Sequence, residues 1–120
     1  MNTRALTTAT AIGTVLQLAM VSAGHVGPTV KALFAIGGMG FSLVAGVIYA
    51  RAAAPTSRGD AVVGGVLTGA ICAFVGILGS YLLGDVPASL LLLGTISSAV
   101  TGAIGGMLGR IGRARVAPAR

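Results

Sequence analysis

The side chains of this chain that could do chemistry are few, and they lie apart in the sequence. There are two carboxylates, Asp60 and Asp85, one histidine, His25, and one cysteine, Cys72. Enzymes that work inside a membrane usually place ionisable groups at depth, where such groups are costly. The sequence contains no carboxylate pair, no Ser–His arrangement and no spacing typical of metal ligands. We therefore expect neither an enzyme nor a metal site, and no required cofactor.

His25 is the one candidate ligand. An imidazole at a membrane edge could hold the metal of a haem or chlorophyll, or respond to pH. The simpler interpretation is a turn residue that bonds water or lipid headgroups. We favour the turn residue and keep cofactor binding through His25 as an alternative.

Gln17 is the most polar side chain within an apolar stretch. It could donate a hydrogen bond to a neighbouring helix, at about 1 kcal/mol, or it could line a polar path. We favour helix packing. The single cysteine, Cys72, excludes an internal disulfide and a cysteine-based metal set.

The composition indicates a membrane protein. Of the 120 residues, 55% are hydrophobic and 8% are charged, and the mean hydropathy is +0.98. This leaves too little polar surface for a soluble domain of such a size. The net charge of +6 could suggest nucleic acid as a partner, but no basic face with interleaved aromatic residues is present.

Four apolar stretches have about the length of 20 residues that a membrane-spanning helix needs. They cover residues 5–23, 28–52, 60–83 and 88–109, and residues 110–120 form a basic tail. Pro28 and Pro87 suit helix starts, and Ser57 with Asp60 is typical of a capping box. The fold class is therefore a single all-α domain with four transmembrane helices, arranged as two tandem helical hairpins.

Two questions about these four spans are left open: whether the first is a signal peptide, and whether the chain contains an internal duplication. Val21-Ser22-Ala23 is typical of a signal-peptide cleavage site, although we favour a retained first helix. Residues 28–51 and 87–110 begin with Pro and end with Arg, whereas AIGGM recurs at 35–39 and 103–107 with a different offset. An internal duplication and chance similarity in a low-complexity sequence explain these repeated patterns about equally well.

The basic residues predict an orientation. With four crossings, seven arginines fall on one side of the membrane and Lys31 alone falls on the other. By the positive-inside rule, both termini are expected in the cytoplasm. The expected location is a bacterial inner membrane. Arg110, Arg113 and Arg115 of the tail are expected to contact lipid headgroups.

Small residues recur at every fourth position in three of the spans, as in small-xxx-small motifs. Such rows let helices approach closely, either within the chain or between chains. The sequence favours neither, because the motif is common in membrane helices. The predicted helix-packing residues are Gly38, Ser42, Gly46, Gly65, Gly69, Gly76, Ser80, Gly94, Ser98, Gly102 and Gly106.

Aromatic anchors are scarce. The chain has no Trp, and only Tyr49 and Tyr81 could form an aromatic belt at the membrane surfaces. With the small-residue rows and the absence of buried charge, this favours a non-catalytic accessory subunit. Such a subunit would pack against other transmembrane subunits, or copies of itself, in a larger bacterial membrane complex, with an energy-converting complex as one candidate.

Two other functions are kept open. One is a small-solute or ion channel or transporter made of several copies, with a pore lined by Thr7, Thr14, Gln17, Ser97 and Thr101. The other is haem or chlorophyll binding through His25. Membrane lipids are expected partners in each case, and nucleic acid is not.

Overall fold

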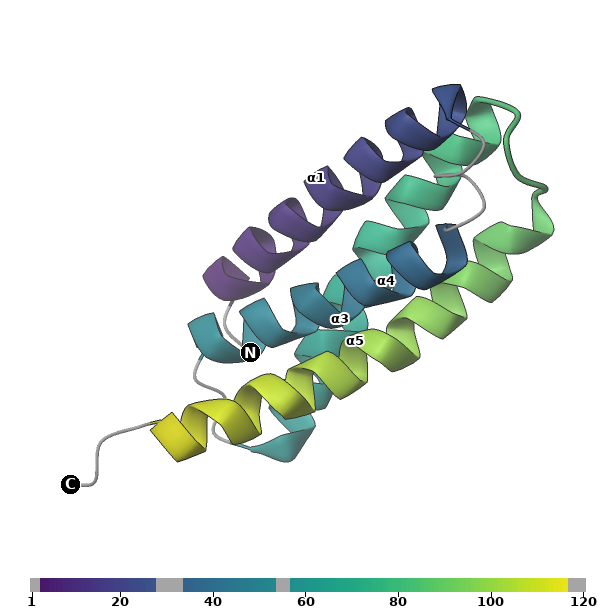
Figure 1. The fold of residues 1–120 in the computed structure, drawn as a ribbon. Coiled ribbons are helices and arrows are strands. Elements are labelled where there is room, and N and C mark those ends of the chain that lie inside the picture. Colours follow the sequence, from purple (N-terminus) through teal and green to yellow (C-terminus); the bar gives the residue numbers. More distant parts are fainter. Residues whose placement is uncertain (1–2, 28–33, 54–56, 117–120) are drawn as a thin grey trace.

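The computed structural model describes residues 3–27, 34–53 and 57–116, and these residues form four helices (Figure 1). They are α1 (Thr3–Val26), α3 (Phe34–Ala53), α4 (Arg58–Leu82) and α5 (Ser89–Val116). Each helix is long and apolar enough to cross a membrane. The prediction of an all-helical chain with four potential spans is confirmed.

The helix bounds differ most from the predicted spans at the end of α5. The fourth span was predicted to stop at residue 109, but α5 continues through Arg110 to Val116. Arginine and alanine, which supply four of these seven residues, are good helix formers, so positive charge alone does not end the helix. Pro28, Lys31 and Arg120 lie outside the described residues.

The start of α4 is fixed by Ser57. Its backbone is extended, and its side-chain oxygen accepts a hydrogen bond from the Asp60 N–H at 3.1 Å. This satisfies one of the backbone donors that a helix start leaves without an intrahelical partner. The Ser57 half of the predicted capping box is therefore present.

A tight turn after α4 places the loop that leads to α5. Gly84 has a φ of 79°, a left-handed conformation that glycine adopts without steric cost. The Gly84 N–H bonds the Tyr81 carbonyl, and the Asp85 N–H bonds the Ser80 carbonyl, each at 2.9 Å. This pattern is a Schellman motif, and it holds Asp85 close to the end of α4.

Helices α3 and α4 lie in the middle of the bundle. Both lie beside α1 and beside α5, and they lie beside each other, whereas no Cα atoms of the described parts of α1 and α5 come within 8 Å of one another. Figure 1 shows α1 and α5 on opposite sides of this central pair. The inner face of α1 repeats every fourth residue through Ala5, Ala9, Gly13, Gln17 and Val21, all of which are buried.

Candidate functional site

One half of the bundle is held by contacts between helix backbones. A methyl group added to Gly102 of α5 would overlap the carbonyl oxygen of Gly65 of α4. One added to Gly46 of α3, or to Gly65, would overlap the carbonyl oxygen of Gly102. Three helices therefore meet around Gly102 with no room for a side chain.

The same close approach extends along α5. A methyl group at Gly105 would overlap the Leu43 carbonyl oxygen, and one at Gly106 would overlap that of Ala61. All of the predicted helix-packing residues except Gly38 and Gly94 are buried in the single chain. Because the rows are occupied by helices of the same chain, they no longer argue by themselves for a protein partner.

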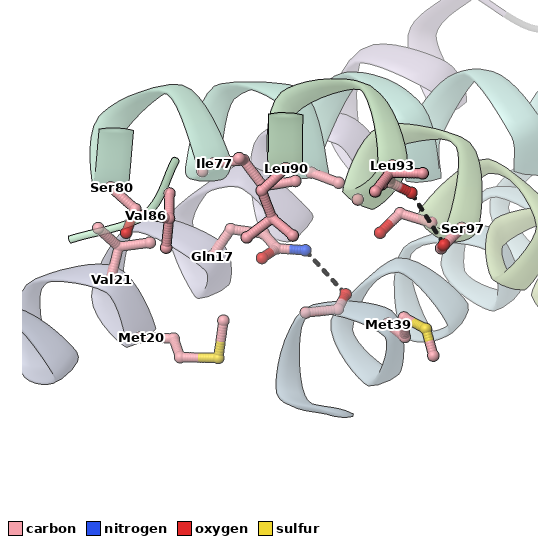
Figure 2. A pocket seen from close by; sticks show the side chains of 15 residues that line it. Gln17, Met20, Val21, Met39, Ile77, Ser80, Val86, Leu90, Leu93 and Ser97 are labelled. Atoms are coloured by element: carbon pink, nitrogen blue, oxygen red, sulfur yellow. Dashed lines mark hydrogen bonds between the residues drawn. The ribbon is translucent and has the colours of Figure 1, made fainter. Parts of the chain in front are cut away.

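The other half of the bundle is hollow. A cavity of about 170 Å³ lies where α1 ends and α5 begins, and all four helices contribute to its wall. The wall is mainly apolar, with a few polar side chains from α1, α4 and α5. Residues that line it include Gln17, Met20, Met39, Ile77, Ser80 and Leu93 (Figure 2).

The cavity is lined by residues of α3 and α5 that precede their glycine contacts. The two helices touch where Leu43 meets Gly105 and where Gly46 meets Gly102. Closer to the start of each helix, Met39 of α3 and Leu93 of α5 instead line the cavity. These two side chains are 36% and 60% exposed, so they mark its open side.

Gly38 and Gly94 belong to this hollow half. Both line the cavity. A Cβ atom at Gly38 would lie 3.5 Å from the Gln17 Oε1 atom, which is an ordinary contact, whereas one at Gly94 would overlap the flexible end of Ile77. Their small size leaves space for the cavity and does not bring two backbones together.

Gln17 connects α1 to the central pair of helices at the cavity wall. Its side chain is 2% exposed, and its Nε2 donates to the Gly38 carbonyl at 2.9 Å and to the Ser42 Oγ at 3.4 Å (Figure 2 draws the first bond). Ser42 in turn donates to the Gly69 carbonyl of α4 at 3.4 Å, and Cys72 Sγ donates to the same carbonyl at 3.4 Å. This network links three helices.

Replacing Gln17 with leucine, which is close in size, should lower the free energy of unfolding by about 1 kcal/mol. The Nε2 bonds are lost, while Ser42 keeps its bond to Gly69. Thermal unfolding in mild detergent, followed by circular dichroism, measures the change. Ser97→Ala is the control, because within the described structure that exposed hydroxyl bonds only a carbonyl of its own helix. Equal unfolding of Gln17→Leu and wild type would contradict a stabilising role for Gln17.

Ser80 is the unusual polar group of the cavity wall. Its side chain is 2% exposed, and its Oγ is buried with no hydrogen-bond partner among the described residues. Thr10 and Thr95 also have such hydroxyls, but neither lines the cavity. Figure 2 draws Ser80 beside Val21 and Val86. An unpaired hydroxyl in an apolar wall costs free energy unless something binds it.

The His25 side chain contacts Asp85, a residue far away in the sequence. Its Nδ1 lies 2.9 Å from Asp85 Oδ2, and the two side chains are 46% and 11% exposed. The pair joins the end of α1 to the α4–α5 loop, next to Val21 and Val86 of the cavity wall. An exposed pair of this kind adds at most about 1 kcal/mol of stability.

The expectation that Tyr49 belongs to an aromatic belt is wrong. The Tyr49 side chain is 0% exposed; its ring lies directly on Gly64 of α4, and its hydroxyl donates to Asp60 Oδ1 at 3.3 Å. A glycine opposite the ring makes room for it inside the bundle. Tyr81, which is 42% exposed, is on the surface.

The proposed pore residues do not gather in one chain. Gln17 and Ser97 line the same cavity, but Thr7 is exposed and donates to the carbonyl of Thr3 in its own helix. Thr14 and Thr101 are half-buried and do not line the cavity. A pore lined by this set would need several copies and stays a hypothesis.

The arginines expected at lipid headgroups all lie on α5. Arg110 is half-buried. The side chains of Arg113 and Arg115 lie outside the described part of the structure. Headgroup binding by the three stays a prediction.

Comparison with protein-family models, with curated proteins and with solved structures finds no match. Within residues 3–27, 34–53 and 57–116, no three His, Cys, Asp or Glu side chains gather as metal ligands. The cavity with Gln17 and Ser80 in its wall is the feature of the described structure best suited to bind a molecule.

Proposed function

We propose that this chain is a non-catalytic membrane protein that binds a membrane-dissolved small molecule in the cavity between its four helices. The observation that carries the proposal is the cavity itself, about 170 Å³ in volume, within helices long and apolar enough to cross a membrane. An apolar cavity of about 150 Å³ in a protein can hold benzene. The space is therefore sufficient for a ligand of that size.

The open side of the cavity supports entry from the membrane. Met39 and Leu93, its exposed apolar wall residues, both lie within apolar helices. If these helices span a bilayer, the opening between α3 and α5 faces lipid tails. A molecule already dissolved in the bilayer can then enter sideways, with no water-filled path.

The test is whether filling the cavity expels a bound molecule. Gly38→Leu would project a side chain into it from a position where a Cβ makes only ordinary contacts. Native mass spectrometry of the chain released from mild detergent should show a small lipid-phase molecule on wild type, and its loss in Gly38→Leu.

Two further variants serve as a control and as a second way to fill the cavity. Gly40→Leu adds the same bulk on the same helix where nothing lies within 4 Å, and it should keep the bound molecule. Ser97→Leu fills the cavity from α5 and should lose it, which covers the case of a Gly38 variant that fails to fold. The same retained mass in all four proteins, or none in wild type, would refute the proposal.

A second proposal is the accessory-subunit role in a larger membrane complex. Its support is a row of exposed aliphatic side chains along α5, spaced so that a neighbouring transmembrane helix could lie on it. Extraction in mild detergent followed by size-exclusion chromatography tests it, because an isolated monomer would count against a stable partner. The row consists of Leu92, Ile96, Val100, Ile104 and Leu108.

We also propose that both termini are cytoplasmic, in a bacterial inner membrane, and that α1–α3 and α4–α5 are two tandem hairpins. The support is that the start of α1, the end of α3, the start of α4 and the end of α5 lie at one end of the bundle (Figure 1). Arg4, Arg51, Arg58 and Arg110 are at or near these helix ends. The positive-inside rule favours the cytoplasm for such an end.

A further inference from the structure

We propose that the cavity binds the polar end of a neutral amphipathic molecule. This end is a head group the size of one ring, bearing a hydroxyl or carbonyl oxygen that pairs with Ser80. Its apolar tail leaves between α3 and α5. The inference rests on the proposed binding function, and it adds the chemical class of the ligand and the residue that recognises it.

The neutrality of the head group follows from the cavity wall. None of the described residues that line it is charged. An ion placed there would lose its hydration without gaining a charged partner, which is strongly unfavourable. The nearby His25 and Asp85 side chains already contact each other and are not part of the wall.

The oxygen of the head group follows from Ser80. Its buried Oγ has no hydrogen-bond partner among the described residues, and a hydroxyl can both donate and accept. Gln17 is less suited to recognition, because its Nε2 already donates to the Gly38 carbonyl and to Ser42. A ligand oxygen at Ser80 would satisfy the group that the fold leaves unpaired.

The size and direction of the ligand follow from the shape of the cavity. Its volume of about 170 Å³ is close to that of a protein cavity that holds a single benzene ring. Met20 and Met39 lie on the wall opposite Ile77 and Leu90 in Figure 2, and methionine adapts readily to the shape of a ligand. A tail attached to the ring would leave past Met39 and Leu93, on the open side.

The experiment compares two probes that differ by one oxygen, para-decylphenol and decylbenzene. Each labelled probe is equilibrated between nanodiscs that contain the full chain and nanodiscs that contain lipid alone, so that simple partition into the bilayer cancels. Wild type should bind decylphenol more tightly than decylbenzene. Ser80→Ala should weaken decylphenol binding by about fivefold and leave decylbenzene binding unchanged.

Thr95→Val is the matched control for Ser80→Ala. It also removes a buried hydroxyl that has no partner among the described residues, but outside the cavity wall, so it should bind both probes as wild type does. Both variants should stay folded, because the hydroxyl that each loses makes no hydrogen bond in the described structure. Circular dichroism in the same nanodiscs checks this.

Each outcome separates the inference from the proposed function. Two results would overturn the role of Ser80 and keep the cavity as a binding site, provided that Gly38→Leu abolishes binding. One is equal binding of decylphenol and decylbenzene by wild type. The other is equal decylphenol binding by wild type and Ser80→Ala. Binding of neither probe above the level of Gly38→Leu would overturn the inference, and the proposed function would then be decided by the molecule that native mass spectrometry finds or fails to find on wild type. Tight decylphenol binding that Thr95→Val weakens as much as Ser80→Ala would also overturn the inference.

Discussion

Replacement of Gly102 with leucine is expected to prevent the chain from folding. Even a single methyl group there would overlap the carbonyl oxygen of Gly65, and it would lie 3.0 Å from the Cα atom of Gly69. Both obstacles are backbone, so whole helices would have to move apart. Overpacking by one or a few carbons typically costs about 1–3 kcal/mol, and a leucine forced between backbones should exceed this. Proteins have only about 5–15 kcal/mol of stability in total.

The measurement is the amount of chain that is extracted folded from membranes after expression. Gly40→Leu is the matched control, since nothing lies within 4 Å of that position, and it should accumulate as wild type does. Gly94→Ala should be mild, because only the movable end of the Ile77 side chain stands in the way. Normal accumulation of Gly102→Leu would refute the backbone contacts of α5 with α4.

Tyr49→Ala should cost about 3–5 kcal/mol of unfolding free energy, as for other large aromatic side chains removed from a protein interior. The ring is fully buried between helices. Ala5 and Ala9 of α1 belong to the same buried cluster, and Gly64 of α4 lies directly against the ring. Alanine would leave a void at a point where three helices meet.

Unfolding in detergent, followed by circular dichroism, measures this loss. Tyr81→Ala is the control, because Tyr81 is 42% exposed, and it should change stability by less than about 0.5 kcal/mol. Tyr49→Phe keeps the ring and removes the hydroxyl that donates to Asp60, so it should cost only about 1 kcal/mol. Equal stability of Tyr49→Ala and Tyr81→Ala would show that Tyr49 is not buried.

The helices could be predicted from the sequence because the signals for each helix lie within its own segment of the chain. Length and hydropathy identify a span in any environment, and Ser57 and Gly84 mark helix ends by local backbone chemistry. The close-packing role of Gly102 follows in part from its place in a row of small residues. The sequence does not show which helix that row contacts, because a row of small residues allows any helix to pack closely, within the chain or outside it.

The cavity could not be predicted, because it depends on how residues of four helices are placed relative to one another. Gly38 and Gly94 look in the sequence like Gly46 and Gly102, yet the first two line a cavity and the others are in backbone contact. The difference lies in which residues of the neighbouring helices stand opposite each glycine. Long-range pairs are hidden for the same reason, as His25 and Asp85 are 60 residues apart.

The central claim, that the cavity is a binding site open to the membrane, is tested most directly by a crystal structure from a lipidic phase doped with a brominated alkylphenol. We predict that the bromine gives an anomalous peak inside the cavity, between Gln17, Ser80 and Gly94, and that Gly38→Leu abolishes it. Bromine found only on the outer faces of the helices, with the cavity filled by protein side chains, would contradict the claim.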